Sequence, residues 1–113
     1  MHELSLALEV LGLVTSEAAK NKVKVVHEIQ IEIGKISGVE SDVFQTALEI
    51  SARNSILEKA RIIIIKSPGK GRCMSCSEEF EMEDLLALCP NCQHQPSEIT
   101  GGKELKVLSM MGE

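Results

Sequence analysis

Four cysteines form two closely spaced pairs in the C-terminal half of the chain: Cys73, Cys76, Cys89 and Cys92. Each pair has the spacing C-x2-C, which lets one tight turn direct both sulfurs toward a single ion. Two such turns complete a tetrahedral shell of thiolates that leaves no position open for water or substrate. The spacing therefore predicts a structural zinc site, with iron in a redox protein as the alternative that four thiolates also permit.

Disulfide bonds are the other chemistry open to four cysteines, and they belong to oxidising compartments. The opening segment MHELSLALEV contains acidic residues and no basic region of the kind that begins a secretory signal. No stretch reaches the roughly 18 consecutive apolar residues of a membrane span. We therefore expect a cytoplasmic protein without membrane contacts, whose cysteines bind metal.

His2 is the second residue whose position permits metal chemistry. The α-amine of Met1, the amide nitrogen of His2 and the His2 imidazole can chelate one ion through two fused rings. This planar set of nitrogens suits Ni(II) or Cu(II) in square-planar geometry. Glu3 adds a carboxylate, which is also suited to the first turn of a helix. A solvated terminal histidine is the alternative interpretation, because any protein can begin in this way.

The charge and the aromatic content argue against a nucleic-acid partner. The formal net charge is −5, and the only aromatic residues are Phe44 and Phe80. Nucleic-acid binding normally rests on a basic patch, and single strands are bound by stacking on aromatic side chains. The sequence also contains no phosphate-binding loop and no motif that pairs a nucleophile with a base. We therefore expect neither a nucleic-acid-binding protein nor an enzyme.

Two helices are predicted from apolar residues at helical spacing. The first runs from Glu3 to about Lys20, and its inward face is marked by Leu4, Leu8, Leu11, Val14 and Ala18, with Ala7 and Val10 beside them. The second ends at about Arg53 and can be capped by Ser37 or Ser41.

Three strands are predicted as well. Residues 23–33 alternate between apolar and polar side chains, which indicates a half-buried strand with His27 on its inward side. Residues 60–65 include four consecutive isoleucines, which favour a strand that is central in a sheet or covered on both sides. A short final strand falls within residues 103–111.

Glycine-containing segments at 68–71 and 101–102 predict flexible linkers on both sides of the cysteines. We therefore expect an α+β fold in which residues 1–67 and 103–113 form a three-stranded sheet with two helices. A zinc-ribbon module, residues 68–102, is inserted between the linkers. An exposed final strand can pair between chains, which leaves a homodimer open.

The opening Met1-His2-Glu3-Leu4-Ser5-Leu6, the strand end Ile31-Glu32-Ile33-Gly34 and the two cysteine pairs follow one another in this order. In this combination the chain resembles, over essentially its whole length, the HypA/HybF family of hydrogenase maturation nickel metallochaperones. The resemblance implies that nickel is bound by the Met1 amine and by the backbone and imidazole nitrogens of His2, with Glu3 close by. It also implies that the zinc is structural.

The resemblance further implies delivery of nickel to the large subunit of a [NiFe]-hydrogenase, together with a nickel-handling GTPase. Some family members have an acidic residue near the nickel at the position of Glu40. Others supply a ligand from a histidine near the second cysteine pair, where this chain has His94. Glu40 and His94 are therefore candidate auxiliary nickel ligands, with a solvated loop histidine as the alternative interpretation of His94. The rival function is a small zinc-ribbon protein-interaction module in transcription or assembly, without nickel transfer.

Overall fold

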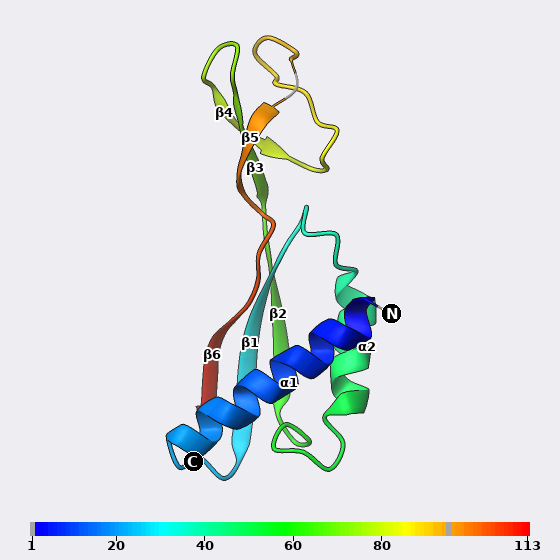
Figure 1. Ribbon diagram of the computed structural model, residues 1–113, viewed down its shortest axis with the longest axis vertical. Helices are drawn as coiled ribbons and strands as arrows, with labels where there is room; N and C mark the ends of the chain where they lie inside the picture. The colour runs from blue at the N-terminus through cyan, green and yellow to red at the C-terminus, as the bar shows by residue number, and fades with distance from the viewer. Residues whose placement is uncertain (1, 95) are drawn as a thin grey trace. The chain divides into compact units, whose positions relative to one another are not determined.

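A computed structural model describes residues 2–94 and 96–113 of the chain (Figure 1). The elements in chain order are α1 (His2–Lys20), β1 (Val26–Gly34), α2 (Ser41–Ser51), β2 (Arg61–Ser67), β3 (Gly69–Cys73), β4 (Glu79–Met82), β5 (Pro96–Gly101) and β6 (Leu105–Gly112). They divide into two compact units. The first unit consists of Met1–Ile31, Val39–Ile65 and Lys106–Glu113, and the second of Glu32–Gly38 and Lys66–Leu105. The predicted α+β fold, with two helices and a separate cysteine module, is confirmed. Neither described helix is long and apolar enough to cross a membrane.

Helix α1 contributes small side chains to the core of the first unit. Its buried residues are Ala7, Val10, Val14 and Ala18, which recur every three or four positions. Leu4 and Leu8 had been expected on this inward face, but they are 38% and 54% exposed. The buried stripe is therefore narrower than the sequence indicated, and α1 leaves large apolar side chains at the surface.

Helix α2 packs against α1 (Figure 1), and its side chains Phe44 and Leu48 are fully buried. The expected cap, Ser37 or Ser41, is wrong, because Glu40 is the N-cap residue and makes no side-chain capping bond. The backbone N–H of Glu40 instead donates to a carboxylate oxygen of Glu3 in α1, at 3.3 Å. A residue from the other helix therefore contributes to this helix end.

The sheet that crosses the first unit has the strand order β2-β1-β6. The central position expected for residues 60–65 is therefore wrong, because β2 is an edge strand and its isoleucines are only partly buried. The central strand is β1, in which Val26, Ile29, Ile31 and Ile33 are buried. Pairing on both sides, rather than the longest isoleucine run, decides which strand lies at the centre.

His27 does not lie on the inward side of β1 as expected. Buried and exposed side chains alternate regularly only from Ile29 onward. Before it, Val26 is buried while Val25 and His27 are exposed. Its Nε2 lies 3.1 Å from a carboxylate oxygen of Glu113.

The second sheet has the order β4-β3-β5, with β3 antiparallel to both neighbours. Gly69 and Gly71, expected in a flexible linker, lie in β3 and are buried. A Cβ added at Gly34 would lie 1.9 Å from the carbonyl oxygen of Gly102, and one added at Gly69 would lie 2.5 Å from that of Met82. These glycines permit backbone segments of the second unit to approach one another closely.

Candidate metal centre

The four cysteine sulfurs converge within the second unit. All four lie within 4.8 Å of one another, with 3.3 Å between the sulfurs of Cys73 and Cys92 and 3.7 Å between those of Cys76 and Cys89. A tetrahedral ion with metal–sulfur bonds of about 2.3 Å requires sulfurs about 3.8 Å apart. The cluster therefore fits one tetrahedral ion such as zinc, and its four cysteines would fill every position of the shell.

The first pair of cysteines is held by a turn that follows β3. The N–H of Cys73 donates to the carbonyl oxygen of Glu78 at 2.9 Å, and the N–H of Ser77 donates to that of Cys73 at 2.7 Å. The two bonds close the turn around the sulfurs of Cys73 and Cys76, so the backbone fixes the direction of both side chains.

The second pair repeats this pattern at the same sequence offsets. The N–H of Cys89 donates to the carbonyl oxygen of His94 at 2.8 Å, and the N–H of Gln93 donates to that of Cys89 at 2.7 Å. Gln93 has a φ of 64° and Ser77 a φ of 63°, a left-handed conformation that side chains other than glycine adopt at a cost. Sequence reasoning missed these two positions, although each directly follows a C-x2-C pair.

The cysteines are also part of the hydrophobic core of the second unit. Cys73 and Cys89 are fully buried with Phe80 and Met82 from β4, and Cys76, Ala87 and Cys92 pack against this cluster. The alternating sequence of β4 turns Phe80 and Met82 inward and Glu79 and Glu81 outward. Metal site and core are therefore one structure, so loss of the sulfur cluster would remove the centre of the unit.

The thiols differ in acidity. The backbone hydrogen bond from Cys76 lowers the pKa of Cys73 to about 6, against the opposing effect of burial. The backbone hydrogen bond from His94 lowers the pKa of Cys92, but the thiol of Cys73, burial and the other thiols outweigh it and raise that pKa to about 12. Of these two thiols, Cys73 therefore loses its proton more readily than Cys92.

His94 lies beside this cluster. Its Nδ1 is 3.3 Å from the sulfur of Cys92, and the side chain is exposed. The imidazole of His94 therefore lies within hydrogen-bond distance of one of the four clustered sulfurs.

The predicted N-terminal site belongs to the first unit, and Met1 lies outside the described residues. His2 is the first residue of α1 and is exposed, whereas Glu3 is half-buried and accepts the hydrogen bond from the Glu40 N–H. That bond is the largest of the effects that lower the pKa of Glu3; the Glu3 amide and the nearby His2 act in the same direction. The structure therefore brings Glu3 and the backbone of Glu40 together next to His2.

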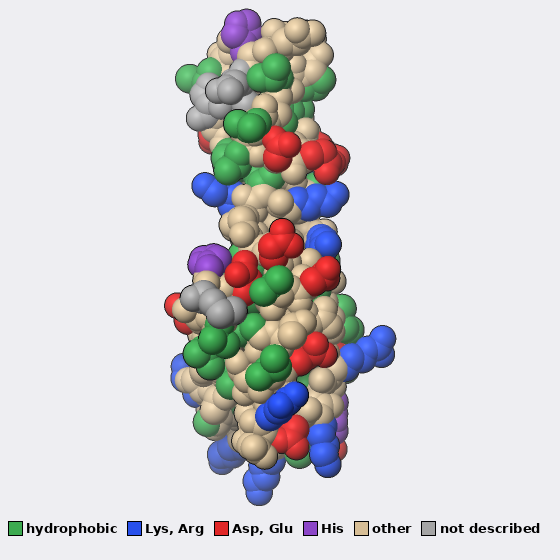
Figure 2. Space-filling model, turned by 90° about the vertical axis from the view of Figure 1, so that its right-hand side faces the viewer, with side chains coloured by type: hydrophobic (Ala, Val, Ile, Leu, Met, Phe, Trp, Pro, Cys, Tyr) green, Lys and Arg blue, Asp and Glu red, His purple; other side chains and the backbone are tan. Residues whose placement is uncertain are grey.

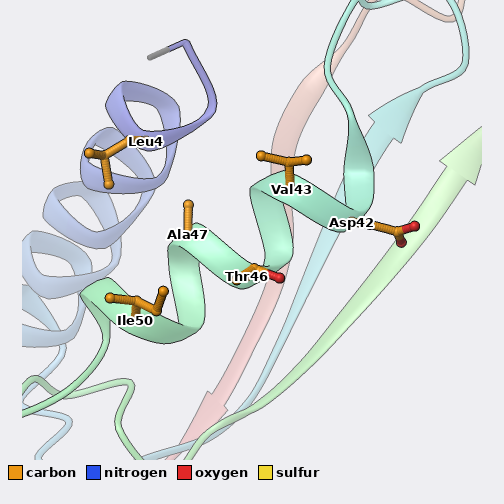
Figure 3. Close-up of a pocket in the computed structure, with 6 residues that line it drawn as sticks. All are labelled: Leu4, Asp42, Val43, Thr46, Ala47 and Ile50. Atoms are coloured by element: carbon orange, nitrogen blue, oxygen red, sulfur yellow. The ribbon is translucent and has the colours of Figure 1, made fainter.

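An apolar groove between the two helices borders this end of α1 (Figure 3). Its volume is about 480 Å³, and its lining residues are Leu4, Asp42, Val43, Thr46, Ala47 and Ile50. Figure 3 shows Leu4 on α1 and the remaining five residues on α2. The residues expected to bind nickel are thus followed directly by exposed apolar surface.

Comparison with known proteins agrees with this architecture. The family model described as hydrogenase/urease nickel incorporation, metallochaperone, hypA, matches residues 1–111. A hydrogenase maturation factor HypA from Parabacteroides distasonis is 41% identical over 111 residues, covering 98% of this chain and 96% of the relative. The HypA from Desulfitobacterium hafniense is 39% identical, covering 97% and 96%.

Two solved structures of HypA proteins are also similar to this chain. The solution structure of the Ni metallochaperone HypA from Helicobacter pylori matches with a TM-score of 0.70 at 25% identity, covering 97% of this chain and 96% of that one. A second HypA solution structure matches with a TM-score of 0.69 at 26% identity, covering 100% and 97%. These matches confirm the resemblance noted in the sequence and favour metal delivery over the rival zinc-ribbon interaction module. The chain belongs to the HypA family of nickel metallochaperones, which serve hydrogenase maturation.

Proposed function

We propose that this chain binds Ni(II) through the Met1 amine, the His2 amide nitrogen and the His2 imidazole, and delivers it for maturation of a [NiFe]-hydrogenase. The observation that carries the proposal, beside family membership, is that α1 begins at His2. The first N–H groups of a helix have no carbonyl partner within it. The His2 amide can therefore lose its proton to nickel without breaking a hydrogen bond of the helix.

Acidic residues offset the positive electrostatic potential at the N-terminus of α1, where nickel is proposed to bind. The N-terminus of a helix carries a partial positive charge, which disfavours a cation. Glu3 supplies a negative charge in the first turn, and its lowered pKa keeps it ionised at neutral pH. Glu40, whose N–H binds Glu3, is exposed and is proposed as an auxiliary nickel ligand.

For the cysteine cluster we propose Zn(II) in a structural role. A shell of four protein ligands has no open position for catalysis, and burial of Cys73 and Cys89 makes the ion part of the core. His94 is proposed as a second auxiliary nickel ligand. The variant His94→Ala distinguishes nickel ligation from a contact to Cys92 alone. Nickel binding should weaken if His94 is a nickel ligand and should stay unchanged if it only contacts Cys92.

The proposed partners follow from the role of the family. They are a nickel-handling GTPase and the large subunit of a [NiFe]-hydrogenase, in the cytoplasm, with neither nucleic acid nor membrane involved. Pairing of two copies through β6, an edge strand of its sheet, is the proposed route to a homodimer.

Nickel titration of tag-free protein tests the N-terminal chelate. His2→Ala and a variant with one residue added before Met1 should each weaken nickel binding at least about tenfold, or about 1.4 kcal/mol. Each change removes or displaces a nitrogen of the chelate. His27→Ala is the matched control, because His27 is an exposed histidine on β1. Zinc content and circular dichroism should stay unchanged in all three variants.

Unchanged nickel affinity in either test variant would contradict the chelate. Equal losses in His2→Ala and His27→Ala would instead indicate binding by surface histidines in general.

A further inference from the structure

The turn that follows β4 exposes three leucines beside the cysteine cluster. In this leucine turn, residues 83–88, the exposed fractions are 56% for Leu85, 77% for Leu86 and 52% for Leu88. Ala87, between them, packs against the cluster formed by the cysteines and β4. The small apolar residue is thus turned inward and the large ones outward, the reverse of what burial of apolar surface favours.

The leucines are held in place by the backbone of the turn. The N–H of Leu86 donates to a carboxylate oxygen of Asp84 at 2.8 Å, and the N–H of Ala87 donates to the Asp84 carbonyl at 3.3 Å. Ala87 anchors the turn in the core, and Leu88 directly precedes the buried Cys89. A partner would therefore meet apolar side chains on an ordered turn, which lowers the entropy cost of binding.

The surroundings of the leucine turn are negatively charged. Glu79 is compensated by Arg72 at 3.4 Å, and Glu81 lies opposite Lys70 in the register of β3 and β4. Glu83 and Asp84 come directly before the leucines, and both are exposed. Four thiolates around a divalent ion add about −2 beside them. Figure 2 shows hydrophobic side chains next to acidic ones on the surface over β3, β4 and β5.

We propose that the leucine turn is a docking surface for a protein partner that presents an apolar pocket bordered by lysine and arginine side chains. The charge selects this partner, because two copies of the turn would repel each other and an anionic lipid surface would repel it too. The inference rests on the proposed function in one respect: the partner is taken to be the protein that accepts the metal.

The test measures binding to the purified nickel-free precursor of the hydrogenase large subunit, with zinc bound at the cysteines. Replacing Leu85, Leu86 and Leu88 together with serine should weaken binding at least tenfold. Glu83→Lys should weaken it as well, and the affinity of the unaltered protein should fall as salt is raised. Leu13→Ser is the control, because Leu13 is similarly exposed, at 51%, on α1.

Equal affinity of the serine variant and the unaltered protein would overturn the proposal, as would a lack of binding by the unaltered protein. Sedimentation that shows self-association through the leucines would overturn it too, and so would binding to vesicles of phosphatidylcholine with phosphatidylglycerol. Nickel titration of the same samples keeps the two proposals apart. A serine variant that binds nickel normally but not the precursor supports docking, whereas unaltered protein that binds no nickel contradicts only the proposed function.

Discussion

Ser77 and Gln93 occupy equivalent positions in the two cysteine turns, with φ angles of 63° and 64° and an N–H donated to the first cysteine of each pair. Glycine adopts this conformation without the cost that a Cβ imposes. The two turns of the metal site therefore share one backbone geometry, although neither has the residue best suited to it.

Replacing Ser77 with glycine should therefore stabilise the metal-bound protein, by about 1 kcal/mol. Thermal unfolding with zinc present is the measurement. Ser75→Gly is the control, because Ser75 is not among the described residues with positive φ and glycine there gains only flexibility. A lower melting temperature for Ser77→Gly would show that the serine side chain contributes more than its backbone costs.

Gly34→Ala should destabilise the protein by about 3 kcal/mol or more, because the added Cβ meets the carbonyl of Gly102 and backbone atoms cannot move aside cheaply. Gly12→Ala is the matched control, since a Cβ at this position in α1 meets nothing within 4 Å. It should stabilise the helix by about 0.5–1 kcal/mol. Denaturant unfolding of both variants checks the pair, and similar effects from both would contradict the close approach.

Zinc affinity should depend more steeply on pH below about pH 6. The backbone hydrogen bond from Cys76 lowers the pKa of Cys73 to about 6, so above that pH this sulfur is already a thiolate. Below it, zinc must displace one further proton, and the logarithm of the affinity should fall by about one additional unit per pH unit. Competition with a chromophoric chelator from pH 5 to pH 8 measures the slope. A constant slope through pH 6 would contradict the early ionisation of Cys73.

Glu3 should titrate below its usual range, since the N–H of Glu40 lowers the pKa of this carboxylate in the folded state. Its contribution to stability is present above the unfolded pKa of about 4.3 and is lost as the pH falls through the lower folded value. Glu3→Gln should consequently be less stable than the unaltered protein at pH 7, and the difference should shrink in acid. Glu9→Gln, an exposed change on the same helix, is the control. The pKa of Glu3 can be measured by following its carboxyl carbon resonance in an NMR pH titration. A pKa at the usual value for glutamate would contradict the contact with Glu40.

The sequence predicted those structural features that are determined by residues close to one another along the chain. The helical spacing of α1 and the two C-x2-C pairs each depend on residues close in the sequence, and the structure contains both the helix and the convergence of the four sulfurs. The cap of α2 was not predictable in this way, because the group that binds the Glu40 N–H is Glu3, far away in the sequence. The edge position of β2 likewise depends on the pairing of β1 with both β2 and β6. The run of isoleucines in β2 contains no information about that pairing.

The glycines show the same limit. Gly69 and Gly102 were read as flexible because glycine often marks a linker. Both are buried, and the atoms that exclude a Cβ there include Met82, Ile36 and Pro68 from separate segments of the second unit. Only the folded arrangement distinguishes a glycine that bends freely from one that lets two backbones touch.

Because the cysteines are part of the core of the second unit, a metal ion bound there would stabilise the folded unit itself. An ion held by the four cysteines would therefore strengthen the core of this unit in a new chain. Under the proposed function the two metals would then enter at different stages of the protein's life, zinc once during biogenesis and nickel repeatedly as cargo. A cell short of zinc would then make chains with a weakened second unit even when nickel is plentiful.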